Sequence, residues 1–401
     1  MTVDKARDVL SFSRAACIDC GVCTNACDLL GRARLTIGEV ASRALAGETS
    51  GAAVDTILRC SLCGLCCADC PEGIETRTTM VAARELLDAA DALPETYQEM
   101  SDGCDFGIFG EYKRAYGIAF DDLDRPDAGT VFFPGCALST YAPEIVRRAH
   151  AWLAGQGIEA GLVDKCCGAG LFAGGMEESG EVLHARLTAE LERRHANRLI
   201  TVCPECYGAL AGTLGGVEVV RLSSLLAEAG VRAPGGGRLT VHDSCSDRAS
   251  GAIGTAVREM LAGNVLVEME HSKSQTICCG SGGLVSCVDP DLSEARAQAR
   301  VDEFRASGAD RMVTACVNCS HRLGAAASPG DVLHYLELIF GVRIDWTDVD
   351  AKLASLFDTD TPPTISSAAA LGGAESAVAE RVAAATTDAS GAEPGAEVSA
   401  S

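Results

Sequence analysis

Short apolar runs alternate with long amphipathic stretches over two segments of the chain, at about residues 129–232 and 238–342. Each segment holds three runs rich in β-branched and apolar residues, which is the pattern of buried strands. In the first segment these runs are "TVFFPGC" (130–136), "GIEAGLV" (157–163) and "RLITVCPEC" (198–206). In the second they are "LTVHDSC" (239–245), "NVLVEME" (264–270) and "RMVTACVNC" (311–319).

A long helical pattern precedes the third run in both segments, "EESGEVLHARLTAELERR" (177–194) and "PDLSEARAQARVDEFRASG" (290–308). Strands that alternate with helices predict βαβ units and a parallel sheet, with any site at the carboxyl ends of the strands. The offsets between corresponding cysteines are 109, 112 and 113 residues, for the pairs Cys136/Cys245, Cys166/Cys278 and Cys203/Cys316. We therefore predict an α/β protein whose two middle domains arose by duplication.

The rest of the chain has other patterns. Residues 1–100 combine clustered cysteines with helix formers and predict a small helical domain, and 101–128 form a connector. "RAPGGGRL" (232–239) is a linker by composition, and the acidic, Ala/Ser/Thr-rich residues 358–401 are expected to be a disordered tail. The apolar run "VLHYLELIFG" (332–341) has about half the length needed to span a bilayer.

The cysteine content decides which chemistry to expect. The chain has 401 residues, 21 cysteines and a formal net charge of −23. It opens with a mixed-charge helical pattern and no long apolar run, so we expect a cytoplasmic protein, where clustered cysteines point to metal more than to disulfides. Strong acidity argues against nucleic acid as a partner.

The first cysteine block is "CIDCGVCTNAC" (17–27) with "CSLCGLCCADCP" (60–71). This is the two-cluster ferredoxin spacing, in which the fourth cysteine of each motif binds the other cluster. We predict one cubane [4Fe–4S] cluster on Cys17, Cys20, Cys23 and Cys70, and another on Cys60, Cys63, Cys66 and Cys27. A pair of zinc sites is the alternative, but zinc motifs usually come as separated C-x2-C pairs.

"CCGAG" (166–170) and "CCGSGG" (278–283) mark the second and third blocks. Two vicinal thiolates can reach one centre only from an irregular turn, for which Gly168 and Gly280 give conformational freedom and room. With a leading cysteine and a C-x2-C, each repeat offers five thiols: Cys136, Cys166, Cys167, Cys203 and Cys206, then Cys245, Cys278, Cys279, Cys316 and Cys319. Five exceed the four of an ordinary cubane or of zinc, and Pro204 suggests that Cys203 begins a helix.

The two complete C…CCG…CxxC sets, with "PGC" (134–136) and "HDSC" (242–245), resemble the cysteine-rich domains of heterodisulfide reductase. A two-cluster ferredoxin fused to a tandem pair of such domains resembles the D-type subunit of that family. The resemblance implies two further [4Fe–4S] clusters, of a non-cubane type, on the ten repeat cysteines. It also implies a disulfide or thiol substrate and a membrane cytochrome b-type partner, which would hold the protein at the cytoplasmic face of the membrane.

Iron–sulfur subunits of anaerobic glycerol-3-phosphate, glycolate and lactate dehydrogenases resemble the same architecture. In that alternative the chain is an electron relay beside a flavoprotein subunit, because it has no G-x-G-x-x-G after a strand. We favour an oxidoreductase acting on sulfur groups, in which the clusters supply the chemistry. A redox sensor or scaffold is less consistent with the full ligand sets.

A few chemically capable residues lie outside the ligand sets. Cys67, Cys104 and Cys287 have no partner at ligand spacing, so we predict structural roles and a small buried side chain for Cys67. His242 and Lys273 could each bring a proton or positive charge to a thiolate, or could be solvated or capping residues. His321 is expected on a helix surface, and Arg248 resembles a position of the family's lead-in.

Overall fold

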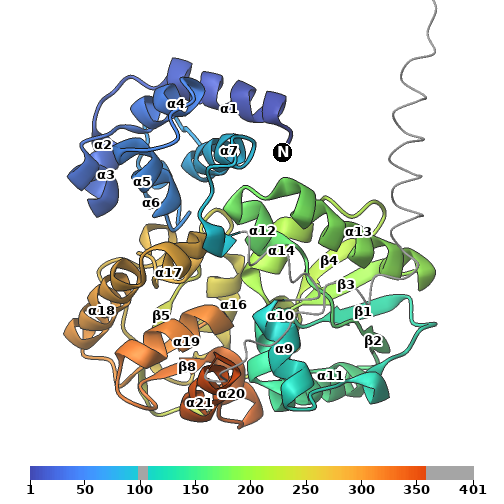
Figure 1. Ribbon diagram of the computed structural model, residues 1–401. Coiled ribbons are helices and arrows are strands. Elements are labelled where there is room, and N and C mark those ends of the chain that lie inside the picture. The colour runs from blue at the N-terminus through green and yellow to red at the C-terminus, as the bar shows by residue number, and fades with distance from the viewer. Residues whose placement is uncertain (98–106, 358–401) are drawn as a thin grey trace, which may run out of the picture. The chain divides into compact units, whose positions relative to one another are not determined.

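The structure, a computed structural model, describes residues 1–97 and 107–357. The predicted tail and Cys104 therefore lie outside the described residues. Figure 1 shows a helical N-terminal domain and two α/β domains. The α/β class with parallel sheets, predicted from the alternating pattern, is confirmed.

The described part of the N-terminal domain consists mainly of short helices. Its core forms where α1 packs against α4 and α7, burying Leu10, Val40 and Met80. Thr36 begins α4 with a capping box, because its hydroxyl accepts from the Glu39 N–H while the Glu39 carboxylate accepts from the Thr36 N–H. The helices are α1 (Val3–Ala16), α2 (Val22–Ala26), α3 (Asp28–Ala33), α4 (Ile37–Leu45), α5 (Ala52–Leu58), α6 (Leu65–Ala68) and α7 (Thr76–Asp88).

Each α/β domain contains a four-stranded sheet, and we call these the first and second CCG domains. The strands of the first are β1 (Thr130–Phe133), β2 (Ala160–Leu162), β3 (Arg198–Thr201) and β4 (Glu218–Arg221). Those of the second are β5 (Arg238–His242), β6 (Val265–Leu266), β7 (Arg311–Thr314) and β8 (Val332–His334). The strand orders, β2-β1-β3-β4 and β6-β5-β7-β8, are the same, and every neighbouring pair is parallel.

The fourth strand of each sheet was not predicted. β4 is short and carries Glu218, and β8 forms the first part of the apolar run 332–341, whose remainder is α20 (Tyr335–Phe340). In the second domain β6 shrinks to two residues, because most of the run 264–270 leaves the sheet.

Helices cover the sheets as the amphipathic patterns predict. In α13 (Glu177–Arg193) the buried leucines Leu183, Leu187 and Leu191 recur every four residues. α18 (Pro290–Ser307) buries Ala297, Val301 and Phe304, but also Arg300. The other helices of the first domain are α10 (Cys136–Tyr141), α11 (Pro143–Gly155), α12 (Ala169–Gly174), α14 (Pro204–Leu210) and α15 (Leu222–Glu228). Those of the second are α16 (Ala252–Met260), α17 (Val285–Val288) and α19 (Val317–Ala326), with 3-10 turns η2 (Cys245–Asp247), η3 (Lys273–Gln275) and η4 (Gly282–Leu284).

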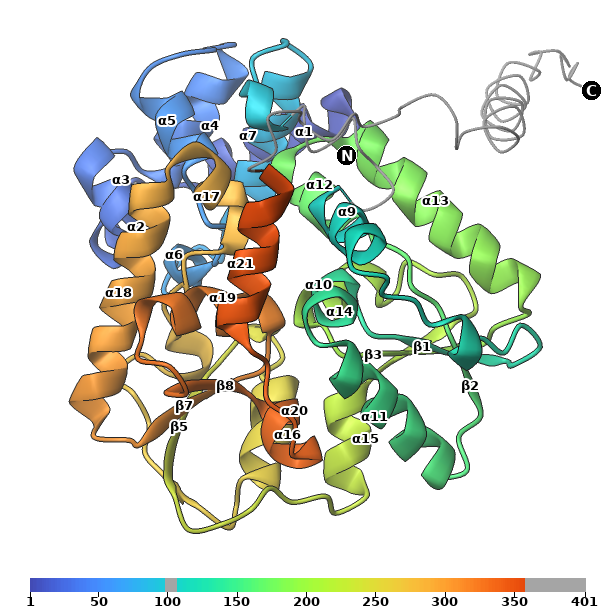
Figure 2. The same cartoon turned by 60° about the horizontal axis from the view of Figure 1, so that its bottom comes forward.

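The two CCG domains share one hydrophobic core. Phe132 and Leu226 of the first lie in the same cluster as Val257 and Leu336 of the second. Figure 2 shows α15 beside α16 and α11 beside α20, pairs that are in contact. The predicted connector 101–128 contributes α9 (Ile108–Ala115) and the 3-10 turn η1 (Asp121–Leu123). Tyr116, directly after α9, bonds to Lys352 O on α21 (Trp346–Phe357) at 2.9 Å.

Candidate metal centres

The first four cysteines of the ferredoxin pattern gather around one hollow of the N-terminal domain. Cys17 ends α1, Cys23 lies on α2, and Cys20 is exposed between them. Cys70 comes from the second motif and lines the same hollow. Cys66 also borders it, so the two predicted ligand groups adjoin.

The second group lies deeper. Burial raises the pKa of the Cys27 thiol to about 11, and repulsion from Cys60 and Cys63 adds to this. Burial likewise raises the pKa of Cys66, with further repulsion from Cys60, Cys63 and Cys27. These four thiols are therefore neighbours. The raised pKa values keep the Cys27 and Cys66 thiols protonated without a metal, so metal binding must release protons.

Arginines surround the loop 60–63 that carries two members of this group. Arg84, with 0% of its surface exposed, donates to Cys60 O at 2.7 Å, to Ala173 O at 2.6 Å and to Gly283 O at 3.0 Å. It thus joins the N-terminal domain to both CCG domains. Arg248 of the second CCG domain donates to Cys63 O at 2.9 Å. Arg296, on α18, donates to Arg59 O at 3.3 Å and to the Ser61 hydroxyl.

The first CCG domain brings its five cysteines together at the carboxyl ends of β1, β2 and β3. The Cys167 and Cys206 sulfurs are 3.3 Å apart. A hydrogen bond to Cys166, together with burial, raises the pKa of Cys136, and repulsion from Cys167 and Cys203 adds to this. Cys203 occupies the N-cap position of α14, as predicted from Pro204. Near them, Asp164 bonds to Lys113 Nζ at 2.7 Å and to the Ser139 hydroxyl at 2.8 Å.

The second CCG domain likewise brings its own five cysteines together. Burial raises the pKa of Cys245 to about 12, and repulsion from Cys279 adds to this. Hydrogen bonds from Cys278 and then from Cys319 lower the pKa of Cys279. Cys316 caps α19, and a hydrogen bond links its thiol to that of Cys319.

The two CCG glycines have the backbone conformation that the sequence argument required. Gly168 has φ +78° and Gly280 has φ +96°, and their N–H groups donate to Cys166 Sγ and Cys278 Sγ at 3.4 and 3.2 Å. We also expected these glycines to leave space near the thiols, and this prediction was wrong. A Cβ would instead meet the carbonyl oxygens of Gly180 on α13 and Ser293 on α18, at 2.7 and 2.3 Å. Glycine is needed because a helix backbone packs against the turn.

The ferredoxin and CCG thiol groups lie close to one another. Cys63 of the second ferredoxin group is near enough to add to the raised pKa values of Cys245 and Cys278, after the larger effects of burial and of the Cys278–Cys279 hydrogen bond. Between the CCG groups lies Glu205, whose pKa is raised by burial and further by Cys279 and Cys166. The second CCG group is therefore next to Cys63, while Cys166 of the first group packs against the N-terminal hydrophobic cluster that contains Cys66.

The donor sets fit iron–sulfur clusters. Thiolates are soft ligands suited to them, and zinc takes four ligands where each CCG group has five. No disulfide joins any cysteine in residues 1–97 or 107–357. Ligation of iron by the individual cysteines stays a prediction.

Comparison with known proteins agrees with this donor chemistry. The 4Fe-4S dicluster domain matches residues 16–75, and the cysteine-rich domain matches residues 130–211 and 239–324. The D-type subunit of the dihydromethanophenazine:CoB–CoM heterodisulfide reductase of Methanosarcina barkeri is 27% identical over 315 residues, which cover 70% of this chain and 75% of that protein. The chain is a homologue of the D-type subunit of heterodisulfide reductase. The resemblance predicted from the CCG and ferredoxin patterns is confirmed.

Two other relatives broaden the picture. The B-type subunit of the fumarate reductase (CoM/CoB) of Methanothermobacter marburgensis is 24% identical, over 76% of this chain and 66% of its own length. The EtfAB:quinone oxidoreductase of Syntrophomonas wolfei is 30% identical over 135 residues, 31% of this chain and 19% of that protein. These relatives, like the heterodisulfide reductase homologue, are oxidoreductases, and two of the three are named as subunits. The chain is therefore an iron–sulfur protein related to subunits of oxidoreductases.

The residues outside the ligand sets are placed as follows. Cys67 is only half-buried, with its thiol 3.8 Å from a Glu75 carboxylate oxygen, so the prediction of a buried side chain was wrong. Cys287 is exposed on α17. Lys273 is solvated, with 65% of its side chain exposed. His321 is half-buried beside the Trp346 ring and bonds to Asp350.

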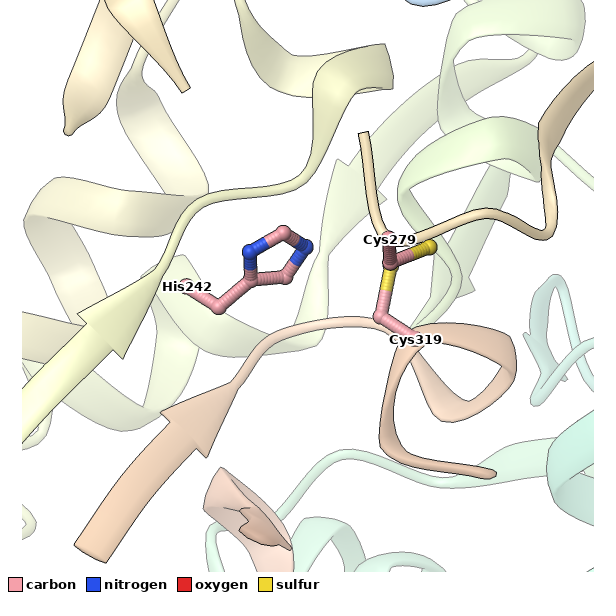
Figure 3. A group of neighbouring side chains, drawn as sticks. All are labelled: His242, Cys279 and Cys319. Carbon is pink, nitrogen blue, oxygen red and sulfur yellow. The ribbon is translucent and has the colours of Figure 1, made fainter. Parts of the chain in front are cut away.

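His242 is neither solvated nor a cap. It is 1% exposed at the end of β5, and one of its ring nitrogens forms a group with the sulfurs of Cys279 and Cys319, all within 4.8 Å of one another (Figure 3). Burial lowers the pKa of this imidazole, and a hydrogen bond with Cys279 opposes that shift. Over residues 1–97 and 107–357, we find no helix with both the length and the apolar content to cross a membrane.

Proposed function

We propose that the chain is the subunit of a multi-subunit oxidoreductase that reduces a disulfide, or oxidises two thiols in the reverse direction. In the forward direction one disulfide takes up two electrons and two protons and yields two thiols. Electrons reach the chain at the exposed Cys20 group and move inward through the group around Cys63 to the CCG sites.

The observation that carries this proposal is the arrangement of the two CCG groups. Glu205 lies near cysteines of both groups, α14 of the first domain contacts η2 of the second, and the second group adjoins Cys63. A disulfide presents two sulfur atoms, and two adjacent thiol-rich sites can each receive one of them. An electron relay needs one such site after the ferredoxin groups, because a single acceptor suffices to pass electrons on.

The eight ferredoxin cysteines would hold two cubane [4Fe–4S] clusters, and the ten CCG cysteines two more of a non-cubane type. When bound, these clusters supply electron storage and affinity for sulfur. The protein would hold them with cysteine thiolates, with the Gly168 and Gly280 N–H donors, and with the arginines around the loop 60–63. The five thiols of each CCG group support a cluster that differs from a cubane.

The partner that we propose is a membrane cytochrome b-type or flavoprotein subunit, with the chain on the cytoplasmic side. The relatives named as subunits support a partner. A relay for a flavin-dependent dehydrogenase is the second candidate function. The match to the EtfAB:quinone oxidoreductase favours it, although this match covers only part of both chains.

Thiol addition separates the two functions. Full-length protein is purified without oxygen and first shown to contain about sixteen iron atoms, as four [4Fe–4S] clusters require. Oxidised protein is then mixed with coenzyme M, cysteine or glutathione and examined by EPR. Disulfide chemistry predicts a new signal with at least one thiol, absent in Cys279→Ser and retained in Cys20→Ser. Unchanged spectra with every thiol, beside rapid reduction by a flavoprotein, would establish the relay instead.

A further inference from the structure

A buried hydrogen bond fixes the protonation of the His242 ring. Arg300 Nε donates to His242 Nδ1 at 3.0 Å. A guanidinium group has only donors, so Nδ1 must be the acceptor. The ring proton therefore lies on Nε2.

Arg300 is itself locked in place. It is 0% exposed and also donates to His271 O and to the Glu303 carboxylate, both at 2.7 Å. These contacts hold the guanidinium on the Nδ1 side of the ring. The proton-bearing Nε2 faces the sulfurs of Cys279 and Cys319, as Figure 3 shows for the ring and the two cysteines.

This orientation decides between two roles for the histidine. A metal ligand must offer a lone pair, and Nε2 has none available while Nδ1 is engaged as an acceptor. The geometry is that of a donor, Nε2–H to a sulfur of the second CCG group. Cys279 is the sulfur with which the ring is hydrogen-bonded.

The first CCG domain has an apolar pair at the same two places. Phe133 ends β1 three residues before Cys136, as His242 ends β5 three residues before Cys245. Gly180 and Ser293 are the equivalent contacts of the CCG glycines, and Leu187 and Arg300 each follow seven residues later. Phe133 and Leu187 pack in one hydrophobic cluster with Cys167. A Phe–Leu pair in one domain thus corresponds to a His–Arg pair in the other.

Lys113 brings a positive charge near the first site, but it does not replace the hydrogen-bond donor that His242 supplies in the second. Lys113 contributes to the lowered pKa of Cys166, after the hydrogen bonds from Cys136 and Cys167. However, Asp164 lies 2.7 Å from its ammonium group, so the two charges largely cancel.

We propose that His242, oriented by Arg300, donates a hydrogen bond to the Cys279 sulfur and makes the second CCG site easier to reduce than the first. A donor to a ligand sulfur stabilises the additional negative charge of the reduced centre, and hydrogen bonds to sulfur are a recognised determinant of cluster potential. Electrons arriving from the Cys63 group would then settle first at the second site. This inference rests on the proposed presence of clusters, but not on the substrate being a disulfide.

Two matched variants test it in the full-length, cluster-loaded protein. The amide nitrogen of Gln can occupy the place of Nε2, whereas that of Asn reaches only the place of Nδ1. His242→Asn should weaken the electron affinity of one CCG centre about tenfold, which is about 59 mV for a one-electron couple. His242→Gln should retain most of the affinity. His150→Asn, in the first domain away from the cysteines, is the control, and the ferredoxin signals should not move in any variant. Equal shifts in the Asn and Gln variants, or none, would overturn the proposal.

A second measurement needs no variant. ENDOR spectroscopy of the partly reduced native protein, in H2O and in D2O, should show an exchangeable proton coupled to one CCG centre and to no second one. A strongly coupled, directly bonded nitrogen would instead make His242 a ligand and overturn the proposal. Failure of the thiol experiment would remove the disulfide function without altering either result.

Discussion

The two CCG domains have the same strand order and the same five cysteines, yet the residues around those cysteines differ consistently. Where the first domain has Phe133 and Leu187, the second has His242 and Arg300. Three residues after the leading cysteine, the first has Ser139, which bonds within its own domain, and the second has Arg248, which reaches Cys63 O. The two repeats therefore share the five cysteines, while their polar surroundings differ.

The two CCG groups also differ in the residues that lie between them and the N-terminal domain. The second CCG group is adjacent to the ferredoxin cysteines, and its neighbours are the ones that carry hydrogen-bond donors and arginines. The first group has mainly apolar neighbours and a Lys113–Asp164 pair. On the function proposed above, this difference corresponds to a division of labour, in which the second site would accept electrons from the ferredoxin groups and the first would receive them from the second.

Removing a CCG cluster from either domain should have the largest and least symmetrical effect. Cys279→Ala should prevent reduction of both CCG sites by a ferredoxin-side donor if, as we propose, electrons enter the CCG pair at the second site. Cys167→Ala should leave the second site reducible at its native rate. Rapid freeze-quench EPR after mixing with reductant measures both rates.

Cys287→Ala is the control for that pair, since Cys287 is exposed and outside both groups. Cys279→Ala and Cys167→Ala should both lose steady-state turnover. Normal reduction of the first site in Cys279→Ala would show that electrons reach the two domains independently.

The sequence predicted the repeated βαβ organisation and, through motif spacing, the cysteines that the fold brings together. It did so because these signals are local: apolar runs, helical periodicity and C-x2-C spacing each lie within one segment. The His242–Arg300 contact joins residues 58 apart, and no local pattern specifies it. One signal was present nonetheless, since Arg300 occupies a position on the apolar face of α18 where α13 has Leu187.

The fourth strands show another limit. β8 and α20 divide a single apolar run, and only tertiary pairing of Met312 with Val332 decides where the strand lies. The role of the CCG glycines was predicted from backbone conformation and from room at the centre, and only the conformation was confirmed. The helix carbonyls that pack against them belong to residues 12 and 13 positions further on, which the motif does not contain.

Replacing Arg248 should have the second-largest effect, which is a loss of stability. Its guanidinium donates to Cys63 O at 2.9 Å and Thr276 O at 2.6 Å, so Arg248→Ser leaves two partly buried carbonyls without these donors. We expect a loss of about 3 kcal/mol in the free energy of unfolding, because hydrogen bonds from charged groups contribute about 1.5–3 kcal/mol each. Calorimetry of the cluster-loaded chain measures the lowered Tm.

Ser139→Ala, at the equivalent place in the first domain, is the matched variant. It removes one hydrogen bond to the Asp164 carboxylate and should cost about 1.5 kcal/mol, about half the loss in Arg248→Ser, which removes two hydrogen bonds from a charged group. A larger loss of unfolding free energy for Ser139→Ala than for Arg248→Ser would contradict the view that Arg248 stabilises the contact between the second domain and the loop 60–63.

The smallest expected effect concerns pH. His334 ends β8, and Arg221 ends β4 in the same register. Burial lowers the pKa of His334 to about 3, whereas an unfolded histidine titrates near about 6.5. Below about pH 6.5 the unfolded chain therefore binds a proton that the folded chain does not, and stability falls as the pH falls towards about 3. Between about pH 6.5 and 5.5 this amounts to about 1 kcal/mol.

Glu337 acts with the opposite sign. Its carboxylate accepts from the His334 and Ile344 N–H groups, and burial raises its pKa, so acidification favours its folded form. The histidine contribution must therefore be taken as a difference between two chains. His334→Phe should flatten the decline in Tm between about pH 6.5 and 5.5 relative to the native protein, because only the histidine is absent. Arg221→Gln should displace the curve without changing its slope, since arginine keeps its charge over this range. If the two variants changed the slope equally, the buried histidine would not be what makes the second domain acid-sensitive, and this difference between the repeats would have no consequence for stability.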